Sequence, residues 1–235
     1  YFDLTMGKQL FRWGSGLLLN PSDVFNKRAI DDISAEQPGV WAARALLAAS
    51  ETLTFTVLGA FDEADCCHAI VAGRVDANVD LTDLAGAVVW DNRNEDVLLT
   101  FDIKSELGVG IWAEVVWTFD LDRVDGDPYG HLDVELGVDY TFDVLSGFYW
   151  AVEWLHQGDG LGDEWSGSGS TPPPDYFGSF GTGGRRGLVG TNYLLVMSRL
   201  LIDSEWRLQV TNLLNLRDPT GTVILQATWL PAGWI

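Results

Sequence analysis

Residues 132–143, LDVELGVDYTFD, alternate between apolar and polar side chains with a period of two. One set is wholly apolar and consists of Leu132, Val134, Leu136, Val138, Tyr140 and Phe142. The other set is mostly acidic and consists of Asp133, Glu135, Gly137, Asp139, Thr141 and Asp143. Because successive side chains of a β-strand point to opposite faces, the pattern predicts a strand. Its apolar face would meet either the core of a soluble sheet or the lipid around a membrane barrel.

The same alternation, strong in some segments and weaker in others, recurs along the whole chain. It predicts about twelve strands, at residues 2–11, 39–49, 53–61, 68–79, 84–90, 97–107, 110–120, 132–143, 148–157, 193–200, 205–210 and 222–230. A tilted membrane strand needs about 9 to 11 residues, whereas soluble strands average about five or six. The lengths therefore favour the membrane setting.

The connections between these segments alternate between short and long. Short turns are expected at residues 50–52, 80–83, 107–110, 144–147 and 202–205, and longer links at 14–39, 62–67, 91–96, 120–131, 158–188 and 215–221. Outer-membrane barrels have this rhythm, with short periplasmic turns and longer extracellular loops. We therefore expect an all-β fold, a transmembrane antiparallel up-and-down β-barrel with both termini periplasmic. The Gly, Ser and Pro content of residues 158–188 indicates an irregular extracellular loop.

Composition agrees with a membrane setting. The chain, expected to form one domain over residues 1–235, carries 14 Lys+Arg against 34 Asp+Glu, for a formal net charge of -20. So acidic a chain is a poor partner for nucleic acid, whose phosphates need clustered cations. Hydrophobic residues reach 47%, yet no run approaches the roughly 18 to 20 apolar residues of a membrane helix, so strands would have to meet the lipid. An interfacial aromatic girdle is expected from Trp13, Trp41, Trp90, Trp117, Trp150, Trp206 and Trp229.

The segment around the end of the first strand carries a motif. In order, it contains Gly7-Lys8-Gln9, Trp13-Gly14 and Asn20-Pro21-Ser22-Asp23. Here the chain resembles a group of porin-like outer-membrane β-barrel proteins of Gram-negative bacteria, in which a strand ending in G-K/R-Q-x-x-x-W-G runs into an apolar stretch and then N-P-x-D. The close match covers about residues 6–26. It implies passive or facilitated passage of small molecules across the outer membrane.

The same resemblance bears on the number of strands. These barrels commonly have more than twelve, and this chain begins within a predicted strand and ends in TWLPAGWI, where PAG has the composition of a turn. We therefore expect that the chain is truncated from a larger even-stranded barrel.

The polar faces of the predicted strands would line the lumen. Their charged residues are Arg44, Arg74, Asp76, Asp102, Lys104, Glu106, Glu114, Asp133, Glu135, Asp139, Glu153, Arg199 and Arg207. Carboxylates outnumber cations there, which favours a channel for small polar or cationic solutes. The link at 14–38 could fold into the barrel mouth, with Trp13, Asn20, Pro21 and Asp23 as candidates for a constriction. Alternatively, the charges pair and plug the lumen, leaving a non-conducting structural barrel of an outer-membrane complex whose partners are other outer-membrane or periplasmic proteins.

An enzyme is the remaining alternative. Glu114 and Glu153 lie on predicted strands amid tryptophans, as do the carboxylate pairs of secreted β-sandwich glycoside hydrolases. A sandwich would leave the long strands and the turn rhythm unexplained, so no enzyme, catalytic residue or cofactor is expected. Cys66, Cys67 and His68 are adjacent but lack the second ligand pair of a zinc site, so no metal site is expected either.

Overall fold

The computed structural model describes residues 1–25, 39–61, 69–92, 95–121, 130–160, 190–217 and 220–230. These residues form twelve β-strands and no helix. The strands are β1 (Phe2–Gln9), β2 (Val40–Ala48), β3 (Leu53–Phe61), β4 (Ala69–Val79), β5 (Thr82–Asp91), β6 (Asp96–Glu106), β7 (Gly110–Asp120), β8 (His131–Phe142), β9 (Phe148–His156), β10 (Asn192–Leu201), β11 (Trp206–Asn215) and β12 (Gly221–Trp229). Within the described ranges, no helix is long and apolar enough to cross a bilayer.

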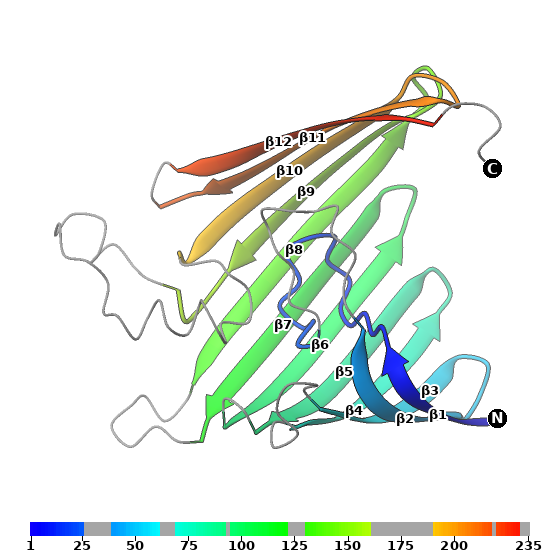
Figure 1. Ribbon diagram of the computed structural model, residues 1–235, viewed down its shortest axis with the longest axis vertical. Coiled ribbons are helices and arrows are strands. Elements are labelled where there is room, and N and C mark those ends of the chain that lie inside the picture. Colours follow the sequence, from blue (N-terminus) through cyan, green and yellow to red (C-terminus); the bar gives the residue numbers. More distant parts are fainter. Residues whose placement is uncertain are drawn as a thin grey trace, which may run out of the picture.

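All twelve strands belong to one antiparallel sheet in which each strand pairs with its neighbours in the sequence (Figure 1). The predicted all-β, up-and-down arrangement is therefore confirmed. Three strands exceed their predicted lengths: β5 begins at Thr82, β10 spans Asn192–Leu201, and β11 continues to Asn215. No pairing joins β1 to β12 among the described residues, so the sheet has two open edges.

The two faces of the sheet differ in exposure. One face, called here the outer face, carries large apolar side chains that remain exposed, such as Val57, Phe101 and Leu225. The opposite face, the inner face, carries fully buried side chains, such as Leu58, Leu98 and Val116. Exposed apolar side chains in such number are unusual for a protein surrounded by water.

Residues 10–25, which follow β1 and are called here the inner segment, lie against the inner face. Phe11, Trp13 and Phe25 belong to an apolar cluster that includes side chains from β2 to β7. Leu18 and Leu19 belong to a second cluster that includes side chains from β9 to β11. A flat sheet would spread these strands over more than about 40 Å, at about 4.8 Å per strand. The sheet instead curves, and the blue trace after β1 crosses in front of β6–β8 in Figure 1.

The inner segment corrects one expectation from the sequence. Trp13 is not part of an outer aromatic girdle, because only 6% of its surface is exposed and its ring packs edge-on against Phe25 at a centroid distance of 4.8 Å. The guanidinium of Arg74 lies over the same ring, 5.5 Å from its centroid. The apolar residues of the segment pack against apolar side chains of the inner face, such as Leu98 and Leu155, and so account for the two clusters there.

Candidate functional site

Two buried carboxylates of the sheet hold the backbone of the inner segment. Glu114 on β7 and Glu153 on β9 both have no exposed surface. They point to the same side of the sheet, because Glu114 lies opposite Glu135 on β8 and Glu153 lies opposite Gly137 on the same strand. A buried carboxylate needs hydrogen-bond donors, and the inner segment supplies them from its main chain.

Glu114 accepts hydrogen bonds from both ends of the loop formed by residues 15–22 of the inner segment. The backbone N–H groups of Ser15 and Gly16 donate to Oε1, the latter at 2.6 Å. The backbone N–H of Ser22 donates to Oε2 at 3.2 Å, and its hydroxyl donates to the same atom at 2.8 Å. Gly14 permits this approach, since its φ is +86° and a Cβ there would lie 2.5 Å from Oε1 of Glu114.

Glu153 binds the next stretch of backbone. The N–H of Leu17 donates to Oε1, and the N–H groups of Leu18 and Leu19 donate to Oε2 at 3.1 and 3.0 Å. Two strand carboxylates thus satisfy a run of main-chain donors over residues 15–19. Charge-assisted bonds of this kind are stronger than those between neutral groups, so the segment is fixed in place.

The Asn-Pro-Ser-Asp turn closes the loop. Asn20 donates from Nδ2 to the carbonyl of Trp13 at 2.7 Å. Its Oδ1 accepts from the N–H of Asp23 at 3.0 Å and lies 3.1 Å from the hydroxyl oxygen of Ser22, whose one proton is donated to Glu114. The constriction candidates Trp13, Asn20, Pro21 and Asp23 therefore all lie in a segment folded onto the inner face. Residues 26–38 of the predicted mouth loop lie outside the described residues.

A third buried carboxylate lies beside the first two. Glu135 has no exposed surface, and its Oε1 accepts a hydrogen bond of 2.8 Å from Nε1 of Trp112. The indole covers Gly137, where a Cβ would collide with the ring. Within the described part of the chain, Oε2 of Glu135 has no hydrogen-bond partner. The alternation in residues 110–120 put Trp112 on the polar face, but only the register shows its partner.

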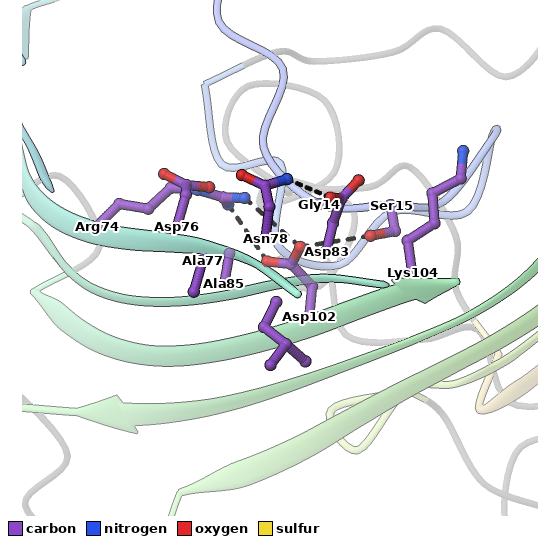
Figure 2. Close-up of a pocket in the computed structure, with 11 residues that line it drawn as sticks. Gly14, Ser15, Arg74, Asp76, Ala77, Asn78, Asp83, Ala85, Asp102 and Lys104 are labelled. Atoms are coloured by element: carbon purple, nitrogen blue, oxygen red, sulfur yellow. Dashed lines mark hydrogen bonds and ion pairs between the residues drawn. The ribbon is translucent and has the colours of Figure 1, made fainter. Parts of the chain in front are cut away.

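A polar cavity of about 320 Å³ opens where the inner segment meets β4, β5 and β6 (Figure 2). Its lining includes Gly14, Ser15, Arg74, Asp76, Asn78, Asp83, Asp102 and Lys104. Arg74 pairs with Asp76, Nε to Oδ1 at 2.7 Å, and with Asp102, Nη1 to Oδ2 at 3.3 Å. Figure 2 also shows Ser15 donating to Asp102, at 3.3 Å, and Asn78 bonded to Asp83. Arg74 is thus matched by carboxylates, while the Lys104 ammonium is 3.9 Å from Glu106 in a largely exposed pair.

The register puts all thirteen charged residues of the predicted lumen on the inner face, in several different environments. Glu114, Glu135, Glu153, Asp102 and Asp133 are buried. Arg74, Asp76, Asp102 and Lys104 border the cavity. Three of the remaining residues have partners on the sheet: Arg44 pairs with Asp3, Asp139 accepts from Tyr149, and Arg199 donates to Gln209. Glu106 and Arg207 are exposed. That the charged residues line a pore stays a prediction.

Two cavity residues, Asn78 and Asp83, were not among the sequence candidates. Asp83 had been assigned to a turn, but β5 begins at Thr82 and brings it opposite Asn78. The sequence also did not predict that Ser15 and Ser22 donate hydrogen bonds to carboxylates of the strands. No sequence signal marks these contacts, because the partners lie far apart in the chain.

The glycosidase alternative requires carboxylates that a sugar can reach. The inner segment covers both Glu114 and Glu153 and occupies their oxygens with main-chain donors, which argues against that chemistry. A different group of side chains, His131, Asp133 and Asp159, has potential metal-ligand atoms within 4.8 Å of one another. Cys66, Cys67 and His68 lie outside the described residues.

Comparison with known proteins adds no assignment. No protein-family model matches the chain, and no curated protein matches it in sequence.

Proposed function

We propose that this sheet is the wall of an outer-membrane β-barrel that passes small polar or cationic solutes, with the inner segment as its constriction. The first support is the outer face. Large apolar side chains are exposed on every strand except β9 and β10, as lipid contact requires and contact with water disfavours. The long links would then face outwards, and the short turns and both termini would face the periplasm.

Aromatic residues on the outer face support the same setting. Near the long links, Trp41, Trp90 and Trp117 are each about two-fifths exposed. Near the short turns, Trp206 and Trp229 stack at a centroid distance of 6.0 Å. Aromatic girdles at both interfaces are typical of outer-membrane barrels.

The cavity beside the inner segment is the observation that carries the transport proposal. It is polar, and Gly14 and Ser15 of the inner segment form part of its lining (Figure 2). Three carboxylates, Asp76, Asp83 and Asp102, face two cations in its lining. The carboxylates exceed the cations of the lining by one charge, so the electrostatic field of the cavity attracts small cations and polar solutes more than anions.

A non-conducting structural barrel is the second candidate. Its support is the packing between the inner segment and the sheet, since two apolar clusters and two buried carboxylates fix the segment across the inner face. If these contacts fill the lumen, the barrel would serve as a scaffold for other outer-membrane or periplasmic proteins.

Planar-bilayer recordings of the detergent-refolded protein under a KCl gradient separate the two candidates. Steady single-channel conductance supports the cation-preferring channel if its reversal potential is shifted from zero towards the equilibrium potential of K⁺. Stable insertion without conductance supports the structural barrel. Failure to insert would contradict the membrane assignment common to both.

A further inference from the structure

Three potential metal ligands meet where β8 begins and β9 ends. His131 is the first residue of β8, Asp133 follows two residues later on the same face, and Asp159 lies in the turn after β9. One ligand atom from each lies within 4.8 Å of the other two. The set is not simply acidic, because an imidazole nitrogen lies within 4 Å of both carboxylates.

The spacing of these atoms is too wide for hydrogen bonds and suits a shared ion. His131 Nε2 is 3.9 Å from Oδ2 of Asp133 and 3.7 Å from Oδ2 of Asp159. Hydrogen bonds of nitrogen to oxygen are usually about 2.7 to 3.2 Å long. Two ligands bound to one ion at about 2.0 to 2.2 Å are separated by roughly 3 to 4 Å, which is close to the observed distances.

The carboxylate of Asp133 is already oriented for this role. Its side chain has no exposed surface, and the backbone N–H of Gly158 donates to Oδ1 at 2.9 Å. The other oxygen, Oδ2, faces His131. Hydrogen bonds of this kind hold the ligands of metal sites in position.

The turn that carries Asp159 is fixed against β8. A Cβ on Gly158 would lie 2.5 Å from the carbonyl oxygen of Leu132, so only glycine allows the turn to come this close. Within the turn, the N–H of Gly160 donates to the carbonyl oxygen of Gln157 at 3.2 Å. The N–H of Gln157 donates to the carbonyl oxygen of Thr191 at 2.7 Å. The third ligand is thus held by backbone contacts beside the first two.

We infer that His131, Asp133 and Asp159 form a binding site for a divalent first-row transition ion of the zinc class. One imidazole nitrogen and two carboxylate oxygens suit zinc and its neighbours, whereas calcium and magnesium prefer all-oxygen shells. Water would complete the coordination. The ion would tie the start of β8 to the turn after β9. The site does not depend on the transport proposal.

Isothermal titration of the refolded, EDTA-treated protein with Zn²⁺ tests the site. The chain also contains Cys66 and Cys67, so the titration uses a background in which both are replaced by serine. We expect one ion per chain with micromolar or tighter affinity. Because each variant removes a ligand, His131→Ala and Asp159→Asn should each weaken binding by at least about 10-fold.

His156→Ala is the matched control. His156 lies at the end of neighbouring β9 and contacts Asn192, but it is not part of the ligand set, so its loss should leave the affinity unchanged. Asp159 is half-exposed, so Asp159→Asn should fold even if His131→Ala does not. Absence of saturable binding to the parent protein, or equal affinity in the parent and Asp159→Asn, would overturn the proposal. None of these readouts requires channel activity.

Replacement of zinc by Co²⁺ gives an independent readout. A bound cobalt ion with an imidazole ligand should give visible absorption bands that His131→Ala removes and His156→Ala retains. Bands that survive His131→Ala would show that the ion binds elsewhere and would overturn the assignment.

Discussion

The backbone N–H of Gly16 donates a hydrogen bond of 2.6 Å to Oε1 of Glu114, a residue 98 positions further along the chain. This contact joins a loop with no regular secondary structure to the middle of the sheet. Because the carboxylate is fully buried, neither group can exchange its partner for water at low cost. The position of the inner segment therefore depends on a few specific side chains of β7 and β9.

Glu114→Ala should release the inner segment. The change leaves the N–H groups of Ser15, Gly16 and Ser22 without their acceptor, and the free energy of unfolding should fall by about 3 kcal/mol. Urea unfolding in detergent, followed by tryptophan fluorescence, measures this change. Limited chymotrypsin digestion should also cut the segment faster than in the parent protein.

Glu106→Ala is the control for that experiment. Glu106 lies on the same face, but its side chain is 63% exposed, and among the described residues its ion pair is with Lys104, at 3.9 Å. Its loss should change stability by less than about 0.5 kcal/mol, as is usual for surface sites. Equal effects of the two substitutions would contradict the role given to Glu114.

Gly14→Ala tests the close approach of the loop to the sheet. Gly14 has a φ of +86°, which other residues rarely adopt, and a Cβ would meet Glu114. We expect a loss of about 1 to 3 kcal/mol in the free energy of unfolding, from backbone strain and displaced contacts. Gly73→Ala on β4 is the control, because a Cβ added at Gly73 would have no atom within 4 Å. If both variants have the stability of the parent protein, the loop does not need glycine at residue 14.

The strands could be predicted from the sequence because a period of two is a local property. Residues 132–143 alternate without exception, and β8 spans His131–Phe142. Prediction was less exact where the alternation weakens. The alternation predicts this strand only as far as Val210 and puts Asn215 in the following link, whereas β11 continues to Asn215; Asn212 interrupts the apolar set of Leu208, Val210 and Leu214.

The candidate site could be predicted only in part, for a physical reason. Alternation assigns Glu114 and Glu153 to the polar face, but it cannot show that Gly16 and Leu19 cover them, since these partners are 98 and 134 residues apart. Trp13 was misassigned for the same reason. A tryptophan near a strand end suits a membrane interface, and only the path of the chain shows that it turns inwards.

Val75→Arg should impair membrane insertion. Val75 is on the outer face near the middle of β4 and is 40% exposed. If that face meets lipid, an arginine near the bilayer midplane costs about 2 to 4 kcal/mol. The yield of protein refolded into lipid vesicles, measured by flotation, should drop sharply.

Asn78→Arg is the matched substitution on the inner face of the same strand. Asn78 is exposed and contacts Asp83, so a cation there remains hydrated and gains a carboxylate partner. This variant should refold into vesicles as well as the parent protein. If Val75→Arg refolds equally well, the outer face does not meet lipid and the barrel proposal is wrong.

Trp112→Phe should destabilise the sheet without removing the ring that covers Gly137. The variant loses the Nε1 donor, so Oε1 of buried Glu135 loses its 2.8 Å hydrogen bond. A buried polar atom without a partner costs about 1 to 3 kcal/mol, which urea unfolding can resolve. Trp117→Phe on the same strand is the control, since it replaces an outer-face ring that is 42% exposed. Equal stability of the two variants would show that the indole donor is dispensable.

Neutralising two cavity carboxylates should reduce the preference for cations. Asp76→Asn with Asp83→Asn removes two negative charges from the lining and leaves Lys104 in place. Under a KCl gradient, the reversal potential should move towards zero or change sign. Glu51→Gln with Asp143→Asn removes the same charge from two exposed turns outside the cavity and should have a smaller effect. If both pairs shift the reversal potential equally, net charge sets the selectivity and the cavity does not. If the parent protein conducts but neither pair changes its selectivity, the solute path avoids the cavity altogether.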